Sequence, residues 1–209
     1  MIKSFKIFGE RHTGTNVVNI FIKHNFALEA KGFEFLGWKH RLAPTNQELK
    51  KHKLDGVLFI FTFRSPYSWL RAMHREPYCY HYPDISKLSF EEFITFQIED
   101  YENSISMWNI KNKSYLNLAE QLTNSIVIKL EDFASNQQEI FTRLDHITNN
   151  DLSVVTTINS YLNGRGVIEG RDLHKNISMD KVPLETLRVI NSFIDKEIME
   201  KLNYKIEEF

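Results

Sequence analysis

Cysteine is almost absent from this sequence, and long apolar runs are missing altogether. The single cysteine, Cys79, excludes an internal disulfide and any zinc site built from several cysteines, which favours a reduced, cytoplasmic protein. No stretch approaches the ~20 apolar residues that a membrane span requires, and the first residues lack the apolar core of a signal peptide. We therefore expect a cytoplasmic protein without a membrane anchor.

An excess of charge of either sign is also lacking. The net charge of −1 gives no general attraction to nucleic acid or to a membrane surface, so we expect neither as a partner and expect any anion site to be local. With 209 residues, of which 42% are hydrophobic and 25% charged, the chain has the composition of a globular protein. No repeat or long linker divides it, so we expect one domain over residues 1–209.

Two of the few glycines bound a loop near the start of the chain, Gly9 and Gly14. Polar and apolar residues alternate in Ser4–Phe8 and predict a strand before this loop, while apolar residues spaced along one face predict a helix over residues 16–26 after it. The first N–H groups of a helix have no partner within it and attract anions. Strand, loop and helix therefore form an anion-binding arrangement.

The spacing of Gly9 and Gly14 matches the first part of the nucleotide-binding pattern GxxxxGK[ST], but the rest of the pattern is missing. Thr15 stands where the pattern has lysine, and Asn16 stands where it has serine or threonine. An ordinary magnesium-dependent ATPase or GTPase is therefore disfavoured. We expect Thr13 or Thr15 to cap the helix. The loop offers a phosphate-like group its backbone N–H groups and the side chains of Arg11, His12, Thr13, Thr15 and Asn16.

A second segment points to the same place in the fold. Residues 56–63 are a continuous apolar run, which is typical of a central parallel strand buried on both faces. Arg64 follows this run directly, and Pro66 suits the first turn of a helix. Because parallel strands of an open sheet bind ligands beyond their carboxyl ends, Arg64 is expected near the first loop.

The rest of the chain continues the alternation of strands and helices. Residues 33–36 predict a short strand that leads to the cationic Lys39, His40 and Arg41. A further strand is expected over residues 125–130. Helices are expected over residues 90–101, 102–108, 115–122, 136–144 and 184–202. This alternation predicts an α/β protein with a three-layer, P-loop-like fold, in which helices flank a mainly parallel central sheet.

Three segments now point to anion binding: residues 9–16, Arg64, and a late glycine-rich loop that carries Arg165 and Gly166. In this combination the sequence resembles the sulfotransferase family, whose donor is 3′-phosphoadenosine 5′-phosphosulfate. The resemblance implies that the chain transfers a sulfuryl group from this donor to a hydroxyl or amine, without a metal.

The resemblance extends over most of the chain. Residues 11–16 are similar to the family's 5′-phosphosulfate loop, and residues 63–75 to its 3′-phosphate segment, especially in the bacterial and phage branch. Residues 127–133 are similar to the family's strand ending in an acidic pair, and residues 195–204 to its closing helix.

The resemblance also implies a role for each residue of the candidate site. His40 would accept the proton of the attacking group, for which a neutral imidazole with a pKa near 6.5 is suited. Lys39 and Arg11 would stabilise charge developing on the leaving phosphate. The 5′-phosphosulfate would be held by Arg11 together with His12, Thr13, Gly14, Thr15 and Asn16.

The 3′-phosphate would be held by Arg64 and, from the late loop, by Arg165 and Gly166. The family has a phosphate-binding serine eight residues after the arginine, and this chain has Ala72 there. Donor affinity is expected to fall unless Ser65, Ser68 or a water molecule takes its place.

The acceptor is expected to be a small molecule or a glycan, and the aromatic residues 78–82 are one candidate lining for its pocket. Two other functions stay open. The first is a P-loop kinase-like phosphotransferase, against which the missing loop lysine argues. The second is a non-catalytic nucleotide- or phosphate-binding module, which Ala72 favours.

Overall fold

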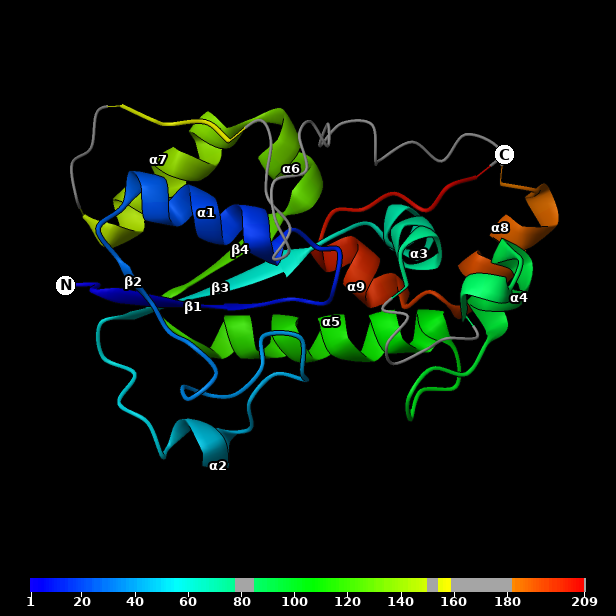
Figure 1. The fold of residues 1–209 in the computed structure, drawn as a ribbon, viewed down its shortest axis with the longest axis horizontal. Helices are drawn as coiled ribbons and strands as arrows, with labels where there is room; N and C mark the ends of the chain where they lie inside the picture. The colour runs from blue at the N-terminus through cyan, green and yellow to red at the C-terminus, as the bar shows by residue number, and fades with distance from the viewer. Residues whose placement is uncertain (78–84, 150–153, 159–181, 209) are drawn as a thin grey trace.

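Four parallel strands form one sheet in the part of the chain that the structure describes (Figure 1). The computed structural model describes residues 1–77, 85–149, 154–158 and 182–208. The strands are β1 (Ser4–Phe8), β2 (Glu29–Ala30), β3 (Val57–Phe63) and β4 (Ser125–Lys129). Their order in the sheet is β2-β1-β3-β4, and each pairing is parallel. The predicted α/β fold with a parallel central sheet is confirmed.

Helices cover both faces of the sheet and give the three expected layers (Figure 1). One face carries α1 (Thr15–Asn25), α6 (Leu130–Ser135) and α7 (Gln137–Thr148), and the long α5 (Ser104–Gln121) crosses the other. The central strand explains this arrangement, because alternate side chains of β3 enter two different cores. Phe59 and Phe61 belong to the core that includes α5, whereas Ile60 belongs to the core that includes α1.

The other α-helices of the described residues are shorter and lie beside this sandwich or beyond its end (Figure 1). They are α2 (Asn46–Leu49), α3 (Pro66–Arg75), α4 (Phe90–Thr95), α8 (Leu184–Phe193) and α9 (Lys196–Lys201). Within the described ranges, none of the helices has the length and apolar content that crossing a bilayer requires.

The structure corrects the strand expected at residues 33–36. This segment is a turn, and φ is positive at Leu36 (60°) and Gly37 (80°), so it cannot continue as an extended strand. The apolar residues of this segment do not form the buried face of a strand, because Phe33 is a surface side chain that is 74% exposed. The strand that does pair with β1 is the two-residue β2, immediately upstream.

Four helix predictions also change. The helices expected over 102–108 and 115–122 are parts of one longer helix, α5, which begins at Ser104 and ends at Gln121, and the helix expected over 90–101 ends as α4 at Thr95. The helix expected over 184–202 breaks after α8 because the Asp195 carboxylate accepts hydrogen bonds from the N–H groups of Glu197 and Ile198 and starts α9.

The strand order creates a switch point between β1 and β3. From β1 the chain continues to β2 on one side, and from β3 it continues to β4 on the other, so the loops after these adjacent strands diverge. A crevice for ligands forms at such a point, beyond the carboxyl ends of the strands. The loop after β1 and the residues after β3 are therefore neighbours, as expected from the sequence.

Candidate functional site

Gly9 begins the loop after β1 at a position with no room for a side chain. A Cβ on this residue would lie 2.7 Å from the carbonyl oxygen of Thr62 on β3 and 2.8 Å from Oγ1 of Thr13. The Gly9 N–H donates to the carbonyl of Lys39 at 3.0 Å, and its own carbonyl accepts a hydrogen bond from Nδ1 of His40 at 2.6 Å. The backbone of Gly9 thus contacts both the segment of Lys39 and His40 and the end of β3.

The end of the loop is set by Gly14, not by a threonine side chain. Gly14 is the N-cap of α1 in the left-handed conformation (φ 89°), and no side chain caps the helix. The expectation that Thr13 or Thr15 would cap α1 is therefore wrong. The Thr13 hydroxyl instead donates to the Glu10 carbonyl at 2.6 Å and contacts Oγ1 of Thr62 at 2.8 Å, which ties the loop to β3.

Beneath the loop lies a buried charged cluster that the sequence did not predict. Glu10 is 0% exposed, and its carboxylate accepts the ammonium of Lys111 on α5 and the backbone N–H of Arg11 at 2.7 Å. Lys111 also donates to the His40 carbonyl at 2.9 Å. Since Glu10 and Lys111 are 101 positions apart, no local spacing pattern could have paired them.

The Arg11 side chain lies between aromatic and acidic groups. Its guanidinium carbon lies 4.8 Å from the centre of the Trp38 ring, and Nη1 lies 3.6 Å from carboxylate oxygens of both Glu10 and Glu99. Its carbonyl accepts the indole N–H of Trp69 on α3 at 2.8 Å. The predicted phosphosulfate-binding arginine is thus only 2% exposed, with its charge balanced by carboxylates.

Arg64 reaches the first loop, as the parallel sheet requires. Its Nη1 donates to the His12 carbonyl at 3.2 Å, and its Nε donates to Oγ of Ser68 at 2.9 Å. Ser68, one of the hydroxyls expected to bind the 3′-phosphate, is thus a hydrogen-bond partner of Arg64. Ala72 lies one turn further along α3 and is 2% exposed within the core.

A carboxylate that the sequence analysis did not single out occupies the start of α3. Oε1 of Glu131 accepts the backbone N–H of Ser65 at 2.9 Å and the Ser68 hydroxyl at 3.3 Å. Its Oε2 accepts the Tyr204 hydroxyl at 3.0 Å. The sequence drew attention to Glu131 only through the similarity of residues 127–133 to a strand that ends in an acidic pair. That similarity did not predict which groups the carboxylate would bind.

His40 is buried against the loop. Because the Gly9 carbonyl can only accept, Nδ1 of His40 carries the proton and Nε2 is left as the basic nitrogen. Burial lowers the pKa of His40 to about 3, more than its hydrogen bond to Gly9 raises it, and the charges of Lys39 and Arg11 add to the shift. His40 is therefore neutral at neutral pH but a weaker base than the sequence suggested.

His12, which was expected among the donor-binding residues, is tied by its ring to the residue that ends α3. Its Nε2 donates to the Glu76 carbonyl at 3.0 Å, and its backbone is left-handed (φ 64°). Burial lowers the pKa of His12 to about 4. The ring is therefore neutral, and the backbone carbonyl is the part of His12 that contacts Arg64.

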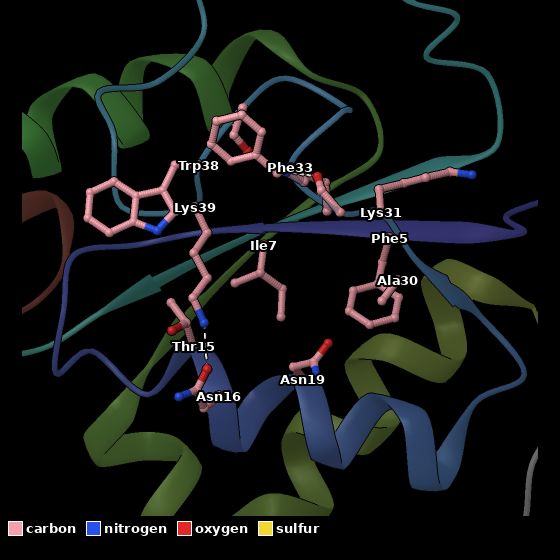
Figure 2. A pocket seen from close by; sticks show the side chains of 13 residues that line it. Phe5, Ile7, Thr15, Asn16, Asn19, Ala30, Lys31, Phe33, Trp38 and Lys39 are labelled. Atoms are coloured by element: carbon pink, nitrogen blue, oxygen red, sulfur yellow. Dashed lines mark hydrogen bonds between the residues drawn. The ribbon is translucent and has the colours of Figure 1, made fainter. Parts of the chain in front are cut away.

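Lys39 lies next to the start of α1, where the loop itself has no lysine. Its ammonium donates to the Asn16 side-chain oxygen at 2.5 Å, so a lysine from a distant segment stands at the start of α1 (Figure 2). Burial lowers the pKa of Lys39 from its usual value. Arg41, the third cation of residues 39–41, pairs with Glu48 of α2 at 2.6 Å.

The described residues hold most, but not all, of the predicted site. Lys39, His40, Arg11, Thr13 and Arg64 meet around the loop through the contacts above. Arg165, Gly166 and the aromatic residues 78–82 lie outside the described residues. Within the described ranges, no three His, Cys, Asp or Glu side chains are placed to share a metal ion.

No known family model matches this chain, and no curated protein matches it. Among solved structures, the chain is similar to the sulfotransferase domain from the Synechococcus PCC 7002 olefin synthase, with a TM-score of 0.41 and 12% sequence identity. The match covers 85% of this chain and 63% of that one, so the chain spans less than two thirds of the neighbour's length. A TM-score this low carries no information about the reaction, and the chemistry has to come from the residues of the site.

Proposed function

We propose that this protein is a sulfotransferase that moves a sulfuryl group from 3′-phosphoadenosine 5′-phosphosulfate to a hydroxyl or amine. The observation that carries the proposal is the contact between Arg64 and the carbonyl of His12 at 3.2 Å. It joins the segment that resembles a 3′-phosphate site to the loop that resembles a 5′-phosphosulfate site, across the switch point of the sheet.

The 5′-phosphosulfate would lie against the N-terminus of α1. Thr15, Asn16 and the Lys39 ammonium stand at this helix start, where oriented N–H groups and the helix dipole favour an anion. The 3′-phosphate would lie against the N-terminus of α3, within reach of Arg64 and Ser68. Two phosphate groups on one nucleotide are thus matched by two helix starts beside adjacent strands.

In the transfer step the acceptor oxygen or nitrogen attacks sulfur, and the bond between sulfur and the bridging phosphate oxygen breaks. The electron pair of that bond leaves with the 5′-phosphate, whose charge Lys39 and Arg11 would stabilise. The acceptor's proton passes to Nε2 of His40 or to water. The product nucleotide is 3′-phosphoadenosine 5′-phosphate, which keeps both phosphates and serves as the binding probe.

The direct test is calorimetric titration with 3′-phosphoadenosine 5′-phosphate and with ADP, which lacks the 3′-phosphate. We expect the parent protein to prefer the former. We expect Arg64→Ala to weaken it by about 10- to 100-fold, as loss of a charge-assisted hydrogen bond does, and to leave ADP unchanged. Arg188→Ala on α8 removes an exposed arginine that pairs with Glu185 and is the matched control.

Arg64→Lys keeps the positive charge but lacks the planar guanidinium group, and it should fold normally. It therefore tests the donor site even if Arg64→Ala proves to be unfolded. Equal affinity of parent, Arg64→Ala and Arg64→Lys for the 3′-phosphorylated nucleotide would show that the donor assignment is wrong.

A non-catalytic module that binds the same nucleotide is the second candidate. Burial of His40, which is 8% exposed with a pKa lowered to about 3, favours it because a base this weak takes up a proton poorly. Turnover with phenol, amine and sugar acceptors decides between the two. If sulfuryl transfer occurs and the His40→Gln substitution slows it, the protein is an enzyme. Tight nucleotide binding with no transfer to any acceptor supports the non-catalytic module.

A further inference from the structure

The guanidinium of Arg11 is closed off from solvent, although the proposed function gives it the donor's 5′-phosphosulfate to bind. The Arg11 side chain is only 3% exposed. Among the described residues, Trp38, Glu10 and Glu99 lie against it. An anion that comes from solvent therefore reaches the N–H groups of the guanidinium only after a neighbour has moved.

Two of these neighbours are poor candidates for the group that moves. Glu10 is 0% exposed, and its carboxylate accepts the ammonium of Lys111 and the backbone N–H of Arg11, so moving it would leave two buried donors unpaired. Trp38 contacts the guanidinium through its ring, which does not compete with an anion for the N–H groups. The competing group that can leave is the carboxylate of Glu99.

Glu99 lies on the solvent side of this cluster. Its side chain is 34% exposed, and its Oε1 is 3.6 Å from Nη1 of Arg11, which is longer than a hydrogen bond. Water can solvate this carboxylate when it swings away from Arg11, whereas the buried carboxylate of Glu10 has no such alternative. Of the two carboxylates, that of Glu99 therefore costs less to displace.

The backbone of Glu99 is in a conformation that glutamate rarely adopts. Its φ is 52°, in the left-handed region, and it lies in the segment between α4 and α5 (Figure 1). Hydrogen bonds between Ile98 and Tyr101, at 3.3 and 2.9 Å, close the turn, and Ile98 is 0% exposed and fixes it to the core. Strained residues of this kind gather at binding and switch sites. Here the strained residue is the one whose carboxylate reaches Arg11.

The charges around Arg11 indicate what kind of ligand can take the place of Glu99. The cations of Arg11 and Lys111 face the carboxylates of Glu10 and Glu99, so the four charges balance. When Glu99 leaves, two cations face one carboxylate. A phosphate-type oxyanion restores the missing negative charge, and it can bind a guanidinium through two parallel hydrogen bonds.

We propose that Glu99 closes the anion site of Arg11 and that a multiply charged oxyanion displaces its carboxylate on binding. The proposal rests on the proposed function, which places the phosphosulfate on Arg11. Because one anion replaces another, the guanidinium is not left as a buried charge without compensation. A singly charged ion such as chloride gains too little at Arg11 to displace the carboxylate, so the site stays closed to it.

Calorimetric titration with inorganic pyrophosphate, without magnesium, measures this competition. Glu99→Gln keeps the size of the side chain and removes its charge, so it should bind pyrophosphate about three- to tenfold more tightly than the parent. Asp100→Asn is the matched control, because it removes the same charge from the next, exposed residue of the turn. It should stay within about twofold of the parent. Unchanged or weaker binding by Glu99→Gln, or an equal gain in Asp100→Asn, would overturn the proposal.

A second variant and a structure test the displacement itself. Glycine adopts the left-handed backbone without strain, so Glu99→Gly keeps the turn and removes the whole side chain. It should bind pyrophosphate as tightly as Glu99→Gln. A gain in Glu99→Gln alone would mean that the glutamine makes a contact of its own, which would overturn the proposal. In a crystal structure of the parent with pyrophosphate, we expect the oxyanion on Arg11 and Glu99 turned away. A Glu99 carboxylate still paired with Arg11 beside bound pyrophosphate would also overturn it.

The same samples are titrated with 3′-phosphoadenosine 5′-phosphate and with ADP. Tighter pyrophosphate binding in Glu99→Gln, without preference of the parent for the 3′-phosphorylated nucleotide, would contradict the proposed function but support the role of Glu99. A clear preference for that nucleotide, with no effect of Glu99→Gln on pyrophosphate, would overturn the role of Glu99 alone. If neither the parent nor Glu99→Gln binds any of the three anions, both proposals are wrong.

Discussion

The carboxylate of Glu131 accepts the backbone N–H of Ser65 at 2.9 Å and so places a negative charge at the start of α3. This is the position that the proposed function gives to the donor's 3′-phosphate. The N-terminus of a helix attracts anions, and in this protein the Glu131 carboxylate is such an anion. The same carboxylate shares Ser68 with Arg64, so an arriving phosphate meets both a cation and a resident anion.

We expect Glu131→Gln to raise the affinity for 3′-phosphoadenosine 5′-phosphate by about three- to tenfold at low salt, because it removes a like charge a few ångströms from the phosphate and keeps an acceptor for Ser65. ADP binding should not change. Calorimetry with both nucleotides measures the effect. Asp132→Asn is the control, since it removes the adjacent charge from a side chain that is 48% exposed and pairs with Lys129.

Weaker binding of both nucleotides by Glu131→Gln would contradict this prediction. It would mean that Glu131 serves only to anchor α3, with Tyr204 holding the carboxylate in place.

Gly9→Ala is expected to destabilise the protein by about 1–3 kcal/mol, the usual cost of overpacking a filled site. The new methyl group would lie 2.7 Å from the Thr62 carbonyl oxygen, and Thr62 is fully buried. Urea unfolding measures the change. In the control, Gly32→Ala, the atoms nearest to the methyl group are at the end of the exposed Glu34 side chain, which can move aside. Equal effects of the two substitutions would contradict the packing described for Gly9.

The Glu10–Lys111 pair is expected to behave as a coupled unit. Both side chains are at most 3% exposed, and removing one partner leaves the other charge buried, which typically costs about 3–5 kcal/mol. Glu10→Gln and Lys111→Met should each destabilise strongly in urea unfolding. The double variant should lose clearly less than the sum of the two.

The exposed pair Lys201–Glu120 provides the comparison. Lys201→Met and Glu120→Gln should barely move the unfolding midpoint, because surface ion pairs contribute little. Additive effects of Glu10→Gln and Lys111→Met would show that the two groups do not interact in the folded protein.

Stability is expected to fall as the pH is lowered from 6.5 toward 4. Burial lowers the pKa of His12 to about 4 and of His40 to about 3, whereas an unfolded histidine titrates near 6.5. Between these values the unfolded chain binds more protons than the folded chain, so the free energy of unfolding rises with pH. Urea unfolding at pH 7 and pH 5 measures this loss.

His40→Gln should reduce that pH dependence, because glutamine does not titrate. Between pH 7 and pH 8 both histidines are neutral in the folded state and mostly neutral in the unfolded chain, so they contribute only a small change. A free energy of unfolding that is the same at pH 5 and pH 7 would contradict the burial of the two rings.

Local patterns were a good guide where a segment's own residues decide its structure. The apolar run before Arg64 and the alternation of Ser4–Phe8 became β3 and β1, and the glycine-bounded loop leads into α1 as expected. The pattern misled at residues 33–36, where alternation came from an exposed phenylalanine. It also misled at the start of α1, where a left-handed Gly14 replaces a threonine cap.

By itself the sequence determined that β1 and β3 are parallel strands of an α/β sheet and that a glycine loop and Arg64 follow them, because strand and turn preferences act over a few residues. Only the tertiary structure decided what surrounds these groups. Lys111 beneath Glu10, Lys39 on Asn16 and Glu131 on Ser65 each bring together residues from different segments. Such contacts follow from how the elements pack, and no spacing along the chain encodes them.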